Sequence, residues 1–218
     1  MKKGVWAIII LVLVLIIVFG ILRGRFRRKE SLSQEELLEI DKIKSTIPPS
    51  NVPSNNIQTT FQKLWLDHVE RTRQFILAEF HNLPDLQQKE NSLMQNQEDI
   101  ANEIDKYYPN SKTILTNLLK EHIAIAKDIV EDLKYRRLNR VPSDINRWYN
   151  NADQFSEAME RINPNWKLKK HFYEHLALTE SEVLAEWVGL KKSSLNIYNN
   201  KIVPNSQKMA NDIIQGIK

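Results

Sequence analysis

Three histidines are the residues of this sequence whose type and spacing most suggest chemistry. His68, His122 and His175 each fall on an apolar stripe, where large apolar residues recur every three or four positions. Neutral imidazole is a common ligand of Zn, Fe and Mn, and ligands from different helices can meet in the core of a helical bundle. A metal site is therefore one interpretation of the three histidines.

Two of these histidines directly follow a glutamate, in the pairs Glu121-His122 and Glu174-His175. The two glutamates complete the candidate ligand set. Adjacent helical residues differ by about 100° around the helix axis, so only one member of each pair can face the core. Diiron bundles instead use Glu-x-x-His, because a three-residue step puts both ligands on one helix face. The spacing therefore argues against the usual diiron arrangement.

The alternative interpretation is a polar layer in the core without any cofactor. Buried histidines are normally satisfied by hydrogen bonds. Thr and Glu residues lie one to three helical turns after His68 and His175 and could provide such bonds: Thr72, Glu79, Thr179 and Glu182. We favour this interpretation, and we keep an Fe, Zn or Mn site as the alternative.

The elements that would position these histidines are all expected to be α-helices. Apolar residues recur at helical spacing, without convincing β alternation, from Phe61 onward. Prolines and Gly189 divide this region, and short connections favour antiparallel neighbours. We therefore predict an up-and-down helical bundle over 61–218. Four of its expected helices are 61–83, 111–138, 143–162 and 166–188. One or two short helices are expected within 86–108, with a break around Asn96. A last helix should begin at Ser193 or Ser194, be kinked by Pro204 and reach residue 217.

The order of motifs suggests an internal repeat. Trp65-x-x-His68 with a proline at 84 resembles Trp148-x-x-Asn151 with a proline at 164, and each precedes a helix that carries a Glu-His pair. We therefore expect two related helix pairs, with residues 86–110 inserted in the first. Asn151 itself could contribute a polar contact, but a cap or an exposed face is the favoured interpretation.

Four motifs together resemble a family of poorly characterised, membrane-associated helical-bundle proteins, chiefly from Gram-positive bacteria. The resemblance covers about residues 61–217 and implies an all-α fold. It also extends, distantly, to ferritin-like metal-binding bundles built from tandem helix pairs, although the Glu-His spacing departs from their pattern. It assigns no functional residue. The motifs are Leu64-Trp65-x-x-His68-Val69-x-x-Thr72-Arg73-x-Phe75-Ile76, Asn82-Leu83-Pro84-Asp85, Leu118-Leu119-Lys120-Glu121-His122 and Trp148-Tyr149-x-Asn151-Ala152-Asp153.

An N-terminal transmembrane anchor with a basic flank is expected within residues 1–30. Val5–Leu22 is an apolar run of 18 residues, which spans roughly 27 Å as a helix and can cross the hydrocarbon core. Five bases follow the run within a few residues, whereas two lysines precede it. The positive-inside rule then places the following domain in the cytoplasm, behind a single span of the cell membrane. A cleaved signal peptide is the less favoured alternative, because the run is long and lacks a small-residue cleavage site.

Residues 31–60 are expected to link the anchor to the bundle. The segment 34–44 has an amphipathic pattern that Ser33 can cap, and it could lie on the membrane or extend a stalk. The stretch 45–60 contains three prolines and several Ser and Asn residues, which favours an extended tether. The folded domain should then begin near Phe61.

Charge and composition exclude several functions. Seven of the 31 Lys and Arg residues, but only one of the 27 Asp and Glu residues, lie in residues 1–30, so the rest of the chain carries a formal charge of −2. Such a domain lacks the basic footprint of a nucleic-acid-binding protein. The chain has no cysteine, which excludes disulfides and thiolate sites. We therefore expect a membrane-anchored interaction or scaffold module that binds a protein partner or itself, and keep a metal-binding bundle with redox or storage chemistry as the alternative.

Overall fold

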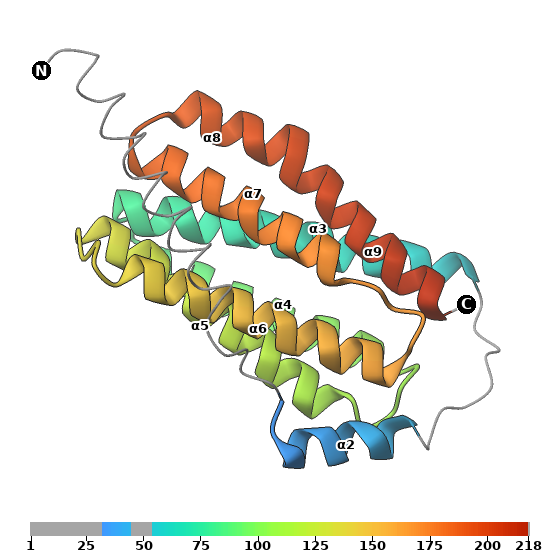
Figure 1. Ribbon diagram of the computed structural model, residues 1–218. Coiled ribbons are helices and arrows are strands. Elements are labelled where there is room, and N and C mark those ends of the chain that lie inside the picture. The colour runs from blue at the N-terminus through green and yellow to red at the C-terminus, as the bar shows by residue number, and fades with distance from the viewer. Residues whose placement is uncertain (1–31, 45–53, 218) are drawn as a thin grey trace, which may run out of the picture.

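The computed structural model describes residues 32–44 and 54–217, and every regular element within those ranges is helical (Figure 1). The predicted all-α fold is therefore confirmed. The elements are α2 (Gln34–Lys44), α3 (Ser54–His81), α4 (Leu86–Asp105), α5 (Lys112–Lys134), α6 (Val141–Ile162), α7 (Lys169–Trp187), α8 (Lys191–Ile197), the π-helical segment η1 (Tyr198–Ile202) and α9 (Val203–Ile217).

The long helices form a closed ring. Helix α3 contacts α4, and contacts continue around the ring through α5, α6, α7 and α9, which returns to α3. Helices α3, α5 and α7 also contact one another across the middle. The C-terminal ends of α3 and α7 meet through His81 and Glu186, and those of α3 and α5 meet through Glu79 and Lys134. The three helices that meet in the centre therefore run in the same direction.

Two apolar clusters fill the bundle, one toward each end. The α2-end core includes Phe61, Trp65, Ile104 and Trp166, and it also contains residues of α2 and α9. The far-end core includes Phe75, Ile129 and Trp148, together with other residues of α3 to α7. The histidines on α3, α5 and α7 lie between residues of the two cores. Burial of these apolar side chains is the main force that holds the ring together.

Helix α2 belongs to the bundle, which corrects the expectation of a separate linker. Leu32 and Ile40 are buried in the α2-end core, and α2 packs against α6. The predicted cap is present as a reciprocal pair, in which the amide of Ser33 donates to Glu36 Oε2 (2.7 Å) and the amide of Glu36 donates to Ser33 Oγ (3.2 Å). Ile40, on the apolar face assigned to a membrane or stalk, thus faces the protein core, whereas Leu38 is exposed.

Helix α3 begins at Ser54, before the expected start at Phe61. The prolines that suggested a tether all precede Ser54, and Ile57 extends the apolar stripe of α3 into the α2-end core. The residues between them have no helix-breaking proline, so tertiary packing outweighs their weak helix propensity. The folded domain therefore includes residues that were expected to be tether.

The inserted region also differs from expectation, because α4 is one continuous helix. The break predicted around Asn96 is wrong. Asn96 and Gln97 are fully buried, and the Asn96 side-chain amide donates to the carbonyl of Leu64 on α3 (3.1 Å). This bond satisfies a polar group inside the helix, so α4 continues and lies between α3 and α5.

Helix ends follow the expected local chemistry. Gly189 has φ +80° and ends α7. The Gly189 amide donates to the carbonyl of Glu186, and the Leu190 amide donates to the carbonyl of Ala185. Near Pro204, which has no amide hydrogen, the chain takes the five-residue π-helical segment η1 before α9 begins. The sequence predicted a kink at Pro204, and the structure has a π-helical segment immediately before the helix that contains this proline.

The expected transmembrane helix, Val5–Leu22, lies outside the described residues. Within 32–44 and 54–217, none of the helices is both long and apolar enough for a bilayer.

Candidate functional site

The three predicted histidines come together in the centre of the ring. His68 of α3, His122 of α5 and His175 of α7 are all buried. The ring centroids of His68 and His175 are 5.5 Å apart, and those of His122 and His175 are 6.4 Å apart. The two parts of the chain that carry Glu-His pairs thus contribute one histidine each to a common layer with His68, as their positions on the apolar stripes predict.

A small cavity of about 10 Å³ adjoins the three histidines. Its other walls are mainly apolar, from residues that include Trp65, Phe155 and Phe172, with Asn151 as a polar exception. A cavity needs roughly 10–15 Å³ of such space to hold one water molecule. The site is thus large enough for about one water molecule and too small for an organic substrate.

His122 is oriented by an asparagine of α6. The Asn151 amide donates to the carbonyl of Leu118 (3.0 Å), which fixes the direction of the side chain. Its oxygen therefore faces Nδ1 of His122 (3.0 Å), and Nδ1 must carry the proton. The Trp148 indole donates to the carbonyl of His122 (3.1 Å) and holds the same turn. The remaining ring nitrogen, Nε2, is then a lone-pair acceptor.

His68 has its polar partner on α4. The amide nitrogen of Gln97 lies 3.3 Å from His68 Nδ1, and it also donates to the carbonyl of Leu93 (2.8 Å). Gln97 Nε2 also lies 3.2 Å from Asn96 Oδ1, so its two amide hydrogens are shared among three acceptors.

His175 is the least satisfied member of the layer. Its Nδ1 is buried and, among the described residues, has no hydrogen-bond partner. One turn later, the buried Thr179 hydroxyl is also without a partner in the described part of the chain. The matching threonine of α3, Thr72, instead donates to the carbonyl of His68 (2.8 Å). Unpaired buried polar atoms commonly mark an ordered water or ion.

Burial keeps all three imidazoles neutral. It lowers the pKa of His68 to about 3, with a smaller contribution from the nearby His122, and it lowers the pKa of His122 to about 4. Burial, followed by the two neighbouring histidines, lowers the pKa of His175 well below its ordinary value. Neutral imidazoles can bind a metal, but they also make an ordinary polar core layer.

The two predicted glutamate ligands do not join this layer. Glu121 and Glu174 are exposed, as expected for residues about 100° from the neighbouring core histidines. Glu121 only accepts a long hydrogen bond from the Asn151 amide (3.3 Å). Across the described ranges, no three His, Asp or Glu side chains are arranged to hold a metal ion. The metal site with Fe, Zn or Mn stays a prediction.

Three polar residues of the layer were not identified from the sequence. Asn151 was expected on a cap or an exposed face, but it is buried and holds His122. The repeat contained a usable signal, because Asn151 occupies the place after Trp148 that His68 occupies after Trp65. Asn96 and Gln97 had no such signal.

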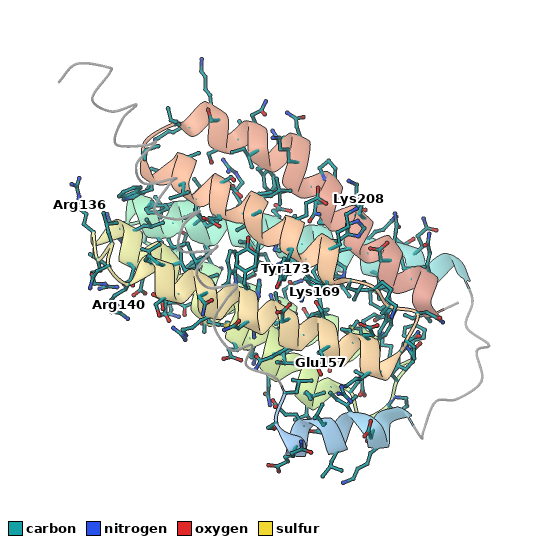
Figure 2. All side chains as sticks on the ribbon, viewed as in Figure 1. Arg136, Arg140, Glu157, Lys169, Tyr173 and Lys208 are labelled. Atoms are coloured by element: carbon teal, nitrogen blue, oxygen red, sulfur yellow. The ribbon has the colours of Figure 1, made fainter. Side chains whose placement is uncertain are left out.

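Two other hollows offer weaker sites. An apolar crevice of about 20 Å³ lies among α3 to α7, and burial raises the pKa of Glu180 in its wall to about 7. A larger polar groove of about 400 Å³ lies along α6 and the start of α7, beside Glu157 and Lys169 (Figure 2). Its charges pair locally, as in Lys169 with Asp153 (2.6 Å), and therefore favour neither an anion nor a cation.

Three buried glutamates, each beside a basic side chain, close the far end of the bundle. Arg73 pairs with the buried Glu182, His81 with Glu186 (2.9 Å), and Lys134 with Glu79 (2.7 Å). Burial raises the pKa of Glu182 to about 7, although the adjacent Arg73 opposes this shift. These pairs join the ends of α3, α5 and α7.

Beyond these pairs, the far end exposes apolar and cationic side chains together. We define the far end face by Leu83, Tyr135, Leu190, Arg136, Lys191 and Lys192. Its apolar members are 42%, 58% and 48% exposed, in that order. Its three cations are exposed, and none forms an ion pair with a described residue. Figure 2 shows Arg136 at this end, on the turn between α5 and α6.

Comparisons with known proteins found no matching family model, no matching curated protein and no matching solved structure.

Proposed function

We propose that this protein is a single-pass membrane protein that presents its helical bundle in the cytoplasm as an interaction module. The apolar run Val5–Leu22 is long enough to span a bilayer, and the bases that follow it favour a cytoplasmic domain. The proposal also places the chain in the poorly characterised bacterial family that its motifs resemble, with two related helix pairs.

The far end face is the single observation that carries the interaction role. Scattered exposed apolar residues are normal, but three at one end, with three cations that form no ion pair with a described residue, form a surface suited to a partner. The interior offers less, because the histidine cavity has room for about one water molecule. We therefore assign the function to the surface rather than to the core.

Membrane integration is tested with the full chain and a Leu13→Arg variant, which places a charge in the middle of the apolar run. A charge at this depth costs a few kcal/mol of insertion free energy. We expect the parent chain to stay in membranes washed with alkaline carbonate and the variant to be partly extracted. Equal extraction of both chains would contradict the anchor.

Orientation is tested with a Lys208→Cys variant, which carries the only thiol of the chain. Lys208 is exposed on α9 (Figure 2). A membrane-impermeant maleimide should label this cysteine in opened vesicles and not in intact cells. Labelling in intact cells would place the domain outside.

A metal-binding bundle remains the second candidate, favoured by Nδ1 of His175, which has no hydrogen-bond partner among the described residues and lies beside two further neutral imidazoles. Elemental analysis after loading with Zn, Fe or Mn tests it in the parent chain and in the His68→Ala/His122→Ala/His175→Ala variant. His81→Ala is the matched control, because His81 is exposed and outside the layer. Stoichiometric metal that disappears only in the triple variant would support this candidate, and no metal in the parent would reject it.

A further inference from the structure

We infer that the partner of the far end face is helix α2 of a second copy of this chain, so that the protein associates head to tail. This inference names the partner in the proposed interaction role and rests on it. Both surfaces belong to the described chain, and each is complementary to the other in charge and in apolar character.

The outer face of α2 is net acidic around one exposed leucine, because Glu35 and Asp41 outnumber the one exposed base beside it, Lys42. Leu38 is 62% exposed, more than any other large apolar side chain of the described residues. Glu35 and Asp41 are exposed one turn before and after it, on the same face. Neither pairs with a base in the described part of the chain. The opposite face of α2 is fixed in the α2-end core through Ile40, so the acidic face is turned outward.

The far end face has the matching composition. Leu83, Tyr135 and Leu190 can receive Leu38, while Arg136, Lys191 and Lys192 can pair with Glu35 and Asp41. Tyr135 is itself held by cations, because Lys134 and Arg137 lie 5.2 Å from its ring. An apolar centre with a charged rim is the usual anatomy of a protein interface.

One copy cannot join the two surfaces by itself. Helix α2 packs with the α2-end core, and the far end face closes the opposite end of a bundle whose helix α3 has 28 residues. At 1.5 Å per residue, α3 alone is about 42 Å long. The contact must therefore form between copies, and because the two surfaces differ it is heterologous, giving a ring or an open row.

Cysteine cross-linking tests the contact directly, because the chain has no cysteine of its own. Full chains with Leu38→Cys and full chains with Leu190→Cys are mixed in detergent and oxidised. We expect the yield of the mixed 38–190 disulfide dimer to exceed the yields of the 38–38 and 190–190 dimers. A mixture of Leu38→Cys with Lys208→Cys is the control and should give little product. Predominant 38–38 or 190–190 dimers, or the absence of cross-linking, would overturn the inference.

Charge reversal tests the same contact without cysteines. Arg136→Glu/Lys191→Glu/Lys192→Glu should weaken association about tenfold or more, because each exposed ion pair contributes up to about fivefold. Glu35→Lys/Asp41→Lys should weaken it similarly, and chains that carry both sets should associate again. Fluorescence-detected sedimentation gives the dissociation constants. Failure of the combined variant to recover, although it folds as judged by circular dichroism, would contradict the proposed pairing.

A bilayer surface is the competing occupant of the far end face. A dye attached to the Leu190→Cys variant reports this docking when vesicles with about one-third phosphatidylglycerol shield it from solvent. Such shielding, together with the absence of a 38–190 cross-link, would replace our inference by membrane docking. Both assays start from detergent-solubilised full chain. They therefore remain informative if the anchor fails the carbonate test, and loss of the anchor is distinguishable from loss of self-association.

Discussion

Acidification should destabilise the bundle through its buried histidines. The pKa of each histidine in the folded chain lies below its ordinary value of 6.5, reaching about 3 for His68 and about 4 for His122. Below pH 6.5 the unfolded chain therefore binds protons that the folded chain does not. The stability that these residues contribute is present above pH 6.5 and is lost as the pH falls toward their folded pKa values.

The magnitude follows from the proton count. One such histidine lowers the free energy of unfolding by about 1.4 kcal/mol per pH unit below 6.5, or about 2 kcal/mol at pH 5. The loss ends near pH 4 for His122, at about 3 kcal/mol, and near pH 3 for His68, at about 5 kcal/mol. Domains of this size are stable by roughly 5–15 kcal/mol, so the three together can unfold the bundle.

Two glutamates act in the opposite direction over part of this range. Burial raises the pKa of Glu180 and Glu182 from 4.5 to about 7. Between pH 4.5 and 7, each therefore keeps a proton in the folded chain that it has lost in the unfolded chain. Their effect on stability becomes more favourable as the pH falls from 7 to 4.5, and offsets about two of the three histidines. The net loss of stability per pH unit should therefore be small above pH 4.5 and become steeper just below it, where the two glutamates no longer offset the histidines.

The assay is urea unfolding of the full chain between pH 7.5 and 4, followed by tryptophan fluorescence. A His122→Gln variant isolates one histidine, because Glu180 and Glu182 are common to both proteins. We expect the variant to be less stable at pH 7.5 and to gain about 2 kcal/mol relative to the parent by pH 5. Parallel curves for the two proteins between pH 6.5 and 5 would refute a buried, neutral His122.

Three further predictions concern single residues. Asn151→Ala removes the partners of His122 and of the Leu118 carbonyl and should cost about 2–4 kcal/mol in urea unfolding, whereas Asn150→Ala on the same helix should cost under about 1 kcal/mol. Gly216→Ala places a Cβ 2.1 Å from Trp166 Cδ1, so it should cost about 1–3 kcal/mol and change the fluorescence of the core; an unchanged melting temperature would contradict this close approach. Glu180→Gln removes a half-buried carboxyl with a raised pKa, so it should stabilise the protein at pH 8 and have little effect at pH 4.5. An equal effect at both pH values would contradict that pKa.

The histidine layer shows what helical periodicity can predict. His68, His122 and His175 were placed inward because apolar residues surround them at helical spacing, and all three are buried. The same reasoning placed only one member of each Glu-His pair inward, and Glu121 and Glu174 are indeed exposed. Periodicity reports the face of a residue on its own helix, so these expectations needed no knowledge of neighbouring helices.

The partners of the layer depend on contacts between helices and could not be predicted in this way. Asn96 and Gln97 look like surface residues until the carbonyl of Leu64 and the ring of His68 are brought beside them. Helix α2 similarly has an amphipathic pattern that suits a membrane as well as a protein core. Only its packing against α6 decides between them.

Sedimentation of full chain in detergent tests most directly whether function belongs to the surface or to the buried layer. Two variants are compared with the parent over the same concentration range: the far-end-face variant Arg136→Glu/Lys191→Glu/Lys192→Glu and the single-site core variant His122→Gln. We predict that the core variant associates at the same concentrations as the parent. The far-end-face variant should need a protein concentration at least about tenfold higher than the parent before it associates. Association that survives in the far-end-face variant but is lost in the core variant would contradict the account.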